Sequence, residues 1–329
     1  MGTRMPDLPV SGSFELPFDN KRYHTLNNHL RRIFGAKVFK VPLDAGFTCP
    51  NRDGTKGHGG CSFCSAAGSG DFAGDRQQDI TGQFQQVTEI MHRKWPSALY
   101  IAYYQAFTNT YAPVDRLYNL YQAALDQPGV VGISVATRPD CLANEVLDLL
   151  QEFQNKTYLW LEIGLQTIHA GTSRAMNIGY DVHDFRDAVR RARDRGLRVC
   201  PHIILGLPGE SREMMMETAR AVLAMDVQGI KIHLLHLMRG TPLEKLYDQG
   251  KLEFMTQDEY VQLIVDILEI LPPTMVVHRL TGDSPRDLLI GPDWSLKKWE
   301  VLNAIDRELS QRDSWQGKYY TDSADGLRE

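Results

Sequence analysis

The chain of 329 residues has no long apolar run, and residues 1–18 contain neither a continuous apolar segment nor a small-residue cleavage site. A membrane-spanning helix needs about 20 consecutive apolar residues, so we expect no export and no membrane partner. Cysteine is scarce as well, because five in a chain of this length cannot form the framework of a disulfide-rich secreted domain. These absences predict a protein of the reducing cytoplasm.

A large excess of either charge is also missing. The sequence has 36 Lys and Arg against 41 Asp and Glu, which gives a formal net charge of −5 and a pI near 6.1. Composition alone therefore gives no support for a nucleic-acid partner, although a chain with this net charge can still have a local basic patch. The length suits one large α/β domain or two smaller ones, and we favour one barrel with short additions.

Most of the cysteine that is present gathers in one place. Cys49, Cys61 and Cys64 lie within sixteen residues, on a glycine-rich stretch that follows the apolar run 38–43. Three soft ligands suit an iron–sulfur cluster with one open iron, to which a cofactor can bind. The same spacing suits a zinc site with His58 as the fourth ligand. A zinc-stabilised binding module without catalysis is therefore an open alternative at this point.

Short apolar runs alternate with amphipathic stretches along most of the chain. Strands are predicted at 38–43, 99–104, 130–136, 158–163, 197–205 and 230–235, and helices at 23–34, 80–94, 114–126, 143–153, 182–195 and 211–225. Repeated strand-then-helix units require parallel strands, and nearly continuous apolar strands suit a sheet covered on both faces. The predicted fold class is α/β, with a partial six-unit TIM-like barrel.

The barrel is predicted to occupy residues 21–240, after a flexible tail at 1–20. Residues 241–315 are expected to form an extension that packs on the barrel, with helices at 242–250, 256–271 and 294–309 and one more strand at 275–280. Thr256 and Glu259 form the sequence pattern of a capping box at the second of these helices. Residues 316–329 are expected to be a flexible polar tail.

Polar side chains occur at or just beyond the ends of the predicted strands, where the reactive groups of parallel barrels converge. They include Gln105, Thr108, Asn109, Thr137, Arg138, Asp140, Glu162, Gln166, His202, Gly206 to Gly209, Lys231, His233, His236 and Arg239. Lys231, His233 and His236 are the predicted catalytic residues on the substrate side, because they lie around the end of the sixth strand. Their expected partners from the C-terminal segment are His278, Arg279, Asp283 and Trp294.

Six segments carry a specific similarity. They read GFTCPNRDG (46–54), GGCSFC (59–64), ATRPD (136–140), LEIGLQT (161–167), HIILGLPG (202–209) and KIHLLH (231–236). In this order they resemble the radical S-adenosylmethionine (SAM) enzymes, more narrowly the YhcC/YtqA group, and more broadly the radical SAM domain of the Elongator catalytic subunit. The commonest family spacing has three residues between the first two cysteines, whereas eleven stand here, a long gap that is typical of the narrower group.

The resemblance implies a [4Fe–4S] cluster on Cys49, Cys61 and Cys64, with SAM bound to the open iron as the source of a 5′-deoxyadenosyl radical. By family position it implies SAM contacts from Gln105, Thr108, Asn109, Ser134, Thr137, Arg138, Glu162, Gln166, His202 and Gly206. Many relatives hold the SAM carboxylate with an arginine where Ile178 stands here. Either Arg174, one turn away, is the substitute, or this chain binds SAM more weakly than those relatives do.

The resemblance further implies an activity on the wobble uridine of tRNA. The expected reaction converts 5-carboxymethylaminomethyl(2-thio)uridine to 5-aminomethyl(2-thio)uridine, with flavodoxin or ferredoxin as electron donor and a separate tRNA methyltransferase acting on the product. The flipped base would stack on aromatic side chains such as Tyr103, Tyr104, Phe107, Tyr111 or Trp294. A radical SAM reaction on a small metabolite or a peptide is the alternative, and the acidic net charge favours it slightly.

Overall fold

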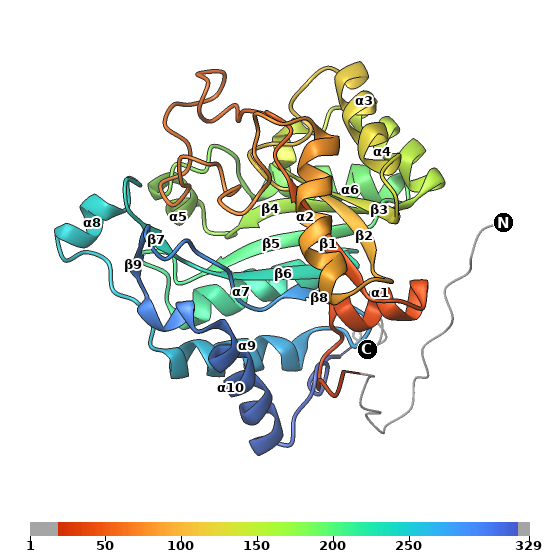
Figure 1. The fold of residues 1–329 in the computed structure, drawn as a ribbon. Helices are drawn as coiled ribbons and strands as arrows, with labels where there is room; N and C mark the ends of the chain where they lie inside the picture. The colour runs from red at the N-terminus through yellow and green to blue at the C-terminus, as the bar shows by residue number, and fades with distance from the viewer. Residues whose placement is uncertain (1–18, 322–329) are drawn as a thin grey trace, which may run out of the picture.

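The centre of the protein is a curled sheet of seven parallel strands (Figure 1), in a computed structural model that describes residues 19–321. In spatial order the strands are β1 (Val38–Leu43), β2 (Leu99–Tyr104), β3 (Val130–Thr137), β4 (Tyr158–Gln166), β5 (Val199–Leu205), β6 (Gly229–Leu234) and β8 (Val276–Arg279). Each strand pairs in parallel with the next one of the barrel. The predicted α/β partial barrel is confirmed, with seven strands instead of six.

The helices around this sheet are α1 (Leu26–Phe34), α2 (Ile80–Lys94), α3 (Val114–Leu125), α4 (Asn144–Lys156), α5 (Ala170–Ala175), α6 (Val182–Asp194) and α7 (Arg212–Leu223), with a 3-10 turn η1 (Pro139–Cys141) before α4. Helices α2, α3, α4, α6 and α7 follow strands and cover the outer face of the sheet (Figure 1), whereas α1 precedes β1 and packs Leu26 against the bottom of the barrel interior. All of the predicted helices of this region are present to within about three residues at each end, since an apolar stripe at helical spacing is a local signal.

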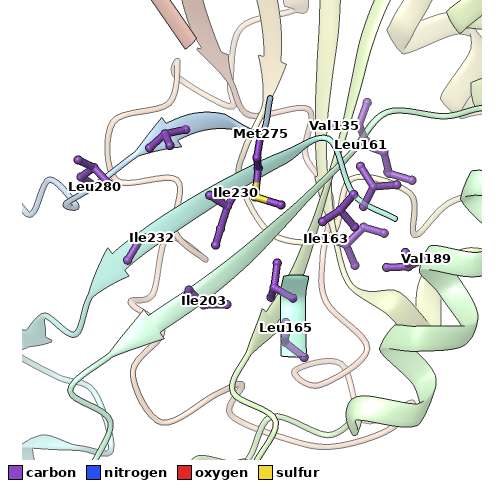
Figure 2. Close-up of a cluster of buried hydrophobic side chains, with 14 of the residues drawn as sticks. Val135, Leu161, Ile163, Leu165, Val189, Ile203, Ile230, Ile232, Met275 and Leu280 are labelled. Atoms are coloured by element: carbon purple, nitrogen blue, oxygen red, sulfur yellow. The ribbon is translucent and has the colours of Figure 1, made fainter. Parts of the chain in front are cut away.

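Successive side chains of each strand point alternately toward the helices outside the sheet and into the interior of the barrel. Figure 2 shows Leu161, Ile163 and Leu165 of β4 in a buried apolar cluster with Val189 of α6. Because successive side chains of a strand point to opposite faces, the residues between them point into the barrel. The bottom of that interior is also apolar, with Trp160, Cys200 and Val276 buried together.

The C-terminal region adds a strand to the partial barrel and does not only pack on it. β8 pairs with β6 in the main sheet, while β7 (Leu237–Met238) and β9 (Leu289–Gly291) form a small antiparallel pair. The helices of this region are α8 (Glu244–Asp248), α9 (Gln257–Ile270) and α10 (Lys298–Gln311), with the 3-10 turn η2 (Asp293–Leu296) before α10. The predicted capping box of Thr256 and Glu259 is confirmed at α9.

The predicted tail from residue 316 onward is wrong for residues 316–321. The amide of Gln316 is buried and donates to the backbone oxygens of Pro272 and Met275. Two further backbone bonds, from Gly317 to Leu268 and from Tyr319 to Glu269, tie this segment to α9. Residues 1–18 and 322–329, where the rest of the two predicted tails falls, lie outside the described residues. Within the described range no helix combines the length and the apolar character of a membrane span.

Candidate active site

A cavity of about 590 Å³ lies at the carboxyl ends of the strands and reaches into the barrel. It brings together three regions that are far apart in the sequence: the cysteine loop (residues 49–64), the inward face of the strands, and residues 278–298. Many of the predicted site residues line it, namely Cys49, Cys61, Cys64, Gln105, Thr108, Thr137, Arg138, Gln166, His202, Lys231, His233 and His236. The cavity is therefore the candidate active site.

The cysteine loop is held in place by hydrogen bonds to the segment after α5. The backbone N–H of Ser62 donates to the oxygen of Met176 at 2.9 Å, and the side chain of Asn177 donates to the oxygen of Gly60 at 2.8 Å. Asn51 donates in turn to the oxygen of Asn177. Gly60 has a φ of 81°, and a Cβ there would lie 2.7 Å from Nε of Arg52. The long gap between the cysteines is thus a tethered turn that only glycine allows at this point.

Nitrogen donors lie beside the thiols. Nδ2 of Asn51 is 3.7 Å from Sγ of Cys61, and Nη1 of Arg138 is 3.9 Å from Sγ of Cys49. Burial raises the pKa of the Cys61 thiol to about 12 and also raises that of Cys64. These thiols will lose their protons only when a strong positive centre binds them, as a metal does.

The donor set fits an iron–sulfur cluster. Three cysteines line one cavity, yet no group of three or more His, Cys, Asp and Glu in residues 19–321 is arranged to hold one metal ion. A cubane cluster distributes its thiolate ligands over different irons, so they need not converge on one point. His58, the fourth ligand of the zinc alternative, is exposed, packs on Gly54 and does not line the cavity.

Arg138 supplies the guanidinium beside the cysteines. Its Nη1 donates to the oxygen of Ile178 at 3.0 Å, and its Nε and Nη2 donate to the two carboxylate oxygens of Asp140, each at 2.9 Å. The predicted substitute, Arg174, is instead exposed in the last turn of α5 and is not part of the cavity lining. Proximity in sequence does not determine which way a short helix faces, and Ile178 itself is buried in an apolar cluster.

The interior of the barrel contains a polar layer to which each of the seven strands contributes one residue. Its members are Lys40, Tyr103, Ser134, Glu162, His202, Lys231 and His278. The carboxylate of Glu162 lies at its centre. One carboxylate oxygen accepts from Lys40 and Ser134, and the other accepts from Lys231 at 2.9 Å and from His202 at 2.7 Å.

Burial and charge together set the protonation of this layer. Burial raises the pKa of Glu162, but Lys231 and Lys40 outweigh it and hold that pKa well below its usual range. Burial lowers the pKa of His202 to about 4 and that of His278 to about 3, so both imidazoles are neutral at pH 7. Burial also lowers the pKa of Lys231 to about 8, although Glu162 opposes this. The layer thus holds one carboxylate and two ammonium groups at pH 7.

Two predicted catalytic residues lie above the polar layer. His233 lines the cavity with its ring centroid 5.5 Å from that of His202. Nε2 of His236, which also lines the cavity, is buried without a hydrogen-bond partner among the described residues. Burial lowers the pKa of His236 to about 4, so this imidazole is neutral at pH 7 and can bond to a ligand.

Other predicted residues lie behind the lining. The side chain of Asn109 donates to the backbone oxygen of Ala136 at 2.8 Å, and Ser134 and Glu162 are fully buried in the polar layer. Gly206 forms a turn with a φ of 86°. None of these four is part of the cavity lining.

Of the predicted stacking residues, only Tyr103 and Phe107 line the cavity. Tyr104 is buried with its hydroxyl on the backbone of Leu120, Tyr111 bonds to Thr55, and Trp294 bonds to the backbone of Met255. An exposed aromatic that no motif predicts, Phe72, lies at the cavity with 51% of its surface exposed.

Lys40 is a member of the polar layer that the sequence motifs do not indicate. It lies in the short strand β1, outside every segment that carries the family resemblance. The only signal is its type: a single lysine among apolar residues of a strand, at a position whose alternation points into the barrel.

The C-terminal segment contributes a group of charged side chains to the rim of the cavity. Arg279 lies 3.1 Å and Lys298 lies 2.8 Å from the same carboxylate oxygen of Asp283, and all three line the cavity. Arg279 and Asp283, predicted as partners on the substrate side, are thus brought to the cavity together with His278.

Known proteins match this chain over most of its length. Residues 51–222 match the Radical SAM superfamily, and residues 227–311 match the Radical_SAM C-terminal domain. The chain is 60% identical to the protein YtqA of Bacillus subtilis over 306 residues, which cover 92% of this chain and 95% of YtqA. It is 38% identical to the protein YhcC of Escherichia coli over 292 residues, which cover 88% of this chain and 93% of YhcC.

The solved structure of Elp3 from the archaeon Methanocaldococcus infernus has the same fold. It aligns with a TM-score of 0.64 at 15% identity and covers 85% of this chain and 64% of that chain. The alternative of a zinc-stabilised binding module is set aside. The match to the radical SAM superfamily accounts for the three cysteines, the barrel and the order of the six segments together. The chain therefore belongs to the radical SAM superfamily, within the group of YtqA and YhcC, and its cofactors are a [4Fe–4S] cluster and S-adenosylmethionine.

Proposed function

We propose that this radical SAM enzyme acts on the wobble uridine of tRNA and converts 5-carboxymethylaminomethyl(2-thio)uridine to 5-aminomethyl(2-thio)uridine. When bound, the cluster and SAM would supply radical chemistry, in which SAM takes up one electron and a hydrogen atom leaves a carbon of the substrate. The carbon that we assign is the methylene between the nitrogen and the carboxylate of the modified side chain, where both neighbours stabilise a radical. Loss of one electron from this carbon, back to the cluster or its donor, would give an imine. Addition of water would then break the C–N bond and release the two-carbon fragment as glyoxylate, with the primary amine left on the uridine. The chain's own residues bind the nucleotide, orient this methylene and exclude water.

One observation carries the proposal: the cavity is basic in a protein that is acidic overall. The formal net charge of the chain is −5, yet seven cationic side chains line the cavity against two carboxylates. The cations are Lys40, Arg52, Arg138, Lys231, Arg279, Arg286 and Lys298, and the carboxylates are Asp71 and Asp283. A nucleotide with a carboxylate on its base brings negative charge at both ends, which such a cavity attracts.

The aromatic side chains at the cavity support a flipped base. Phe107 lies beneath two guanidinium groups, with Cζ of Arg52 at 5.5 Å and Cζ of Arg76 at 5.3 Å from its ring centroid. Phe72 is the exposed aromatic of the same wall. Aromatic rings and arginines within one cavity are the combination with which proteins hold single-stranded bases.

The proposal assigns the remaining partners by their chemistry. The cluster needs a low-potential electron donor, such as flavodoxin or ferredoxin, and both the donor and SAM are available in the cytoplasm. The primary amine of the product is a substrate for a tRNA methyltransferase. We assign the SAM contacts to the residues around the cysteine loop, with Arg138 in place of Arg174.

The test uses reconstituted enzyme, a chemical reductant, SAM and tRNA that carries 5-carboxymethylaminomethyl(2-thio)uridine. Digestion to nucleosides and mass spectrometry should show the 5-aminomethyl nucleoside in an amount that follows 5′-deoxyadenosine release. In cells, deletion of the gene should leave the carboxymethylaminomethyl nucleoside to accumulate. Release of 5′-deoxyadenosine with an unchanged nucleoside profile in both experiments would reject tRNA and favour a small metabolite or a peptide.

A further inference from the structure

We propose that the polar layer of the barrel is a receptor for the carboxylate of the substrate, with the ammonium groups of Lys40 and Lys231 as its ligands and Glu162 as the residue that positions them. This inference rests on the proposed function, because it names the part of the tRNA nucleoside that enters the barrel. It also makes a separate claim, since a receptor for a carboxylate can be tested without tRNA.

The charges of the layer leave one positive charge without a partner. Two ammonium groups face the single carboxylate of Glu162, and the imidazoles of His202 and His278 are neutral at pH 7. Lys231 is 5% exposed and Glu162 is fully buried, so water screens this excess poorly. An uncompensated buried charge is destabilising, and a bound anion removes the cost.

The donors are arranged to accept such an anion. Nζ of Lys231 uses two of its three N–H groups, on Tyr103 at 2.6 Å and on Glu162 at 2.9 Å, which leaves one for a ligand. Lys40 has 19% of its side chain exposed, and its Nζ already has Ser134, Glu162 and His278 as partners, so it attracts an anion by its charge. Both lysines line the cavity. Nζ of each lies 4.7 Å from the ring centroid of Tyr103, so both cations lie next to the same ring.

The depth of the layer separates this receptor from the cysteine loop. Lys40 and Lys231 each stand three residues before the last residue of their strands, β1 and β6. At about 3.3 Å per residue, the layer lies about 10 Å below the strand ends. The cysteines follow the end of β1, so an anion on the two lysines is distinct from one that binds at the cysteine loop.

The direction of the modified side chain suits the proposed chemistry. A wobble uridine that enters from the mouth extends its carboxymethylaminomethyl group toward the bottom of the barrel, with the carboxylate at its tip. Fixing the tip on the lysines leaves the adjacent methylene above them, on the side of the cavity that faces the cysteines. The receptor therefore selects a substrate with a terminal carboxylate and fixes the position of the carbon next to it.

The experiment compares two tRNAs that differ only at the wobble position, one with 5-carboxymethylaminomethyluridine and one with 5-methylaminomethyluridine, which lacks the carboxylate. Dissociation constants are measured with reconstituted holoenzyme and SAM, without reductant. The wild type should bind the first tRNA at least about tenfold more tightly, as expected for one charge-assisted contact. Lys40→Met and Lys231→Met should reduce this ratio to about one.

Lys298→Met is the matched control, because it removes a cation from the rim of the same cavity. It should weaken both tRNAs alike and keep the ratio. Iron content and circular dichroism verify that each variant is folded, and Lys231→Gln replaces Lys231→Met if that variant is not. If the wild type forms product and the two lysine variants keep the full ratio, the receptor is rejected while the proposed function stands.

A second arm does not depend on tRNA. Acetate is compared with chloride at equal ionic strength, and the melting temperature of the holoenzyme is recorded. Acetate should stabilise the wild type and the Lys298→Met variant but neither variant of the polar layer. If no tRNA product forms and acetate still stabilises in this lysine-dependent way, the carboxylate receptor stands and the proposed function fails. If acetate has no such effect and the tRNA ratio is unchanged, the receptor is rejected.

Discussion

The two ends of the active-site cavity are built in opposite ways. The cysteine loop has its three thiols within sixteen consecutive residues and is held by hydrogen bonds to Met176 and Asn177. The polar layer takes one residue from each of seven strands, and the register of the sheet brings them together. The first site is local in sequence, and the second exists only when the whole barrel is formed.

This difference predicts how each end responds to change. A substitution in the cysteine loop should abolish cofactor binding and leave the barrel folded, because the loop adds little to the core. A substitution in the polar layer should destabilise the barrel itself, since Glu162 bonds to side chains of β1, β3, β5 and β6. Cofactor content and folding free energy are therefore the two quantities to compare.

The largest effect is expected for Cys61→Ala. Loss of one of three thiolate ligands should remove the cluster and lower 5′-deoxyadenosine release by at least about 1000-fold, or about 4 kcal/mol. Iron, sulfide and visible absorbance of the anaerobic protein measure the loss directly. The midpoint of urea unfolding, measured without the cluster, should stay that of the wild type.

Cys141→Ala is the control for this substitution, because that thiol bonds to Asp140 and does not line the cavity. It should keep the cluster and the release of 5′-deoxyadenosine. A variant without Cys61 that retains full iron content would contradict the assignment of the three ligands, whatever its activity.

At the other end of the cavity, Glu162→Gln is expected to destabilise the fold. The amide keeps the shape but leaves two buried ammonium groups without a counter-charge, at a cost of about 3–5 kcal/mol in unfolding free energy. Urea unfolding at pH 7 measures it. Glu152→Gln breaks the exposed pair with Lys156 and should have almost no effect. Equal effects of the two substitutions would show that the polar layer is no more than a set of weak ion pairs.

The same contrast explains what the sequence could predict. β1 and β2 were predictable to the residue, because short, nearly continuous apolar runs are local signals. That the three cysteines lie at one site was predictable for the same reason. The role of Lys40 was not, because it depends on which residues of β3, β4 and β8 lie opposite, and no pattern within β1 contains that register. Arg174 failed as a substitute because spacing alone does not orient α5.

Acid should reveal the polar layer through its histidines. His202 binds a proton near pH 6.5 when the chain is unfolded, but burial lowers its pKa to about 4 in the folded protein. Between these values the unfolded state binds more protons, so stability falls as the pH decreases from 6.5 to 4. His202→Gln should reduce this slope by up to about 1.4 kcal/mol per pH unit.

Urea unfolding at pH 7, 6 and 5 measures the slope. His236 and His278, whose pKa values burial lowers to about 4 and about 3, keep part of the acid sensitivity in the variant. His183→Gln is the control, because that side chain is exposed at the start of α6. An unchanged slope in His202→Gln would mean that the pKa of His202 is the same in the folded protein as in the unfolded chain.

The smallest effect is expected at Asn177, which connects the cysteine loop to the rest of the barrel. Its side chain donates to the oxygens of Gly60 and His58, and its φ of 51° lies in the left-handed region. Asn177→Ala loses both hydrogen bonds and disfavours the left-handed backbone conformation, whereas Asn177→Gly loses the hydrogen bonds alone.

The rate at which a chelator removes iron from the holoenzyme should rise about tenfold in the alanine variant and less in the glycine variant. Urea unfolding of the barrel should be the same in both, because the tether acts on the loop and not on the strands. A fall in unfolding free energy as large as that of Glu162→Gln would instead show that the loop and the polar layer unfold as one cooperative unit. The two ends of the cavity would then differ in how far apart their residues lie in the sequence, but not in how they unfold.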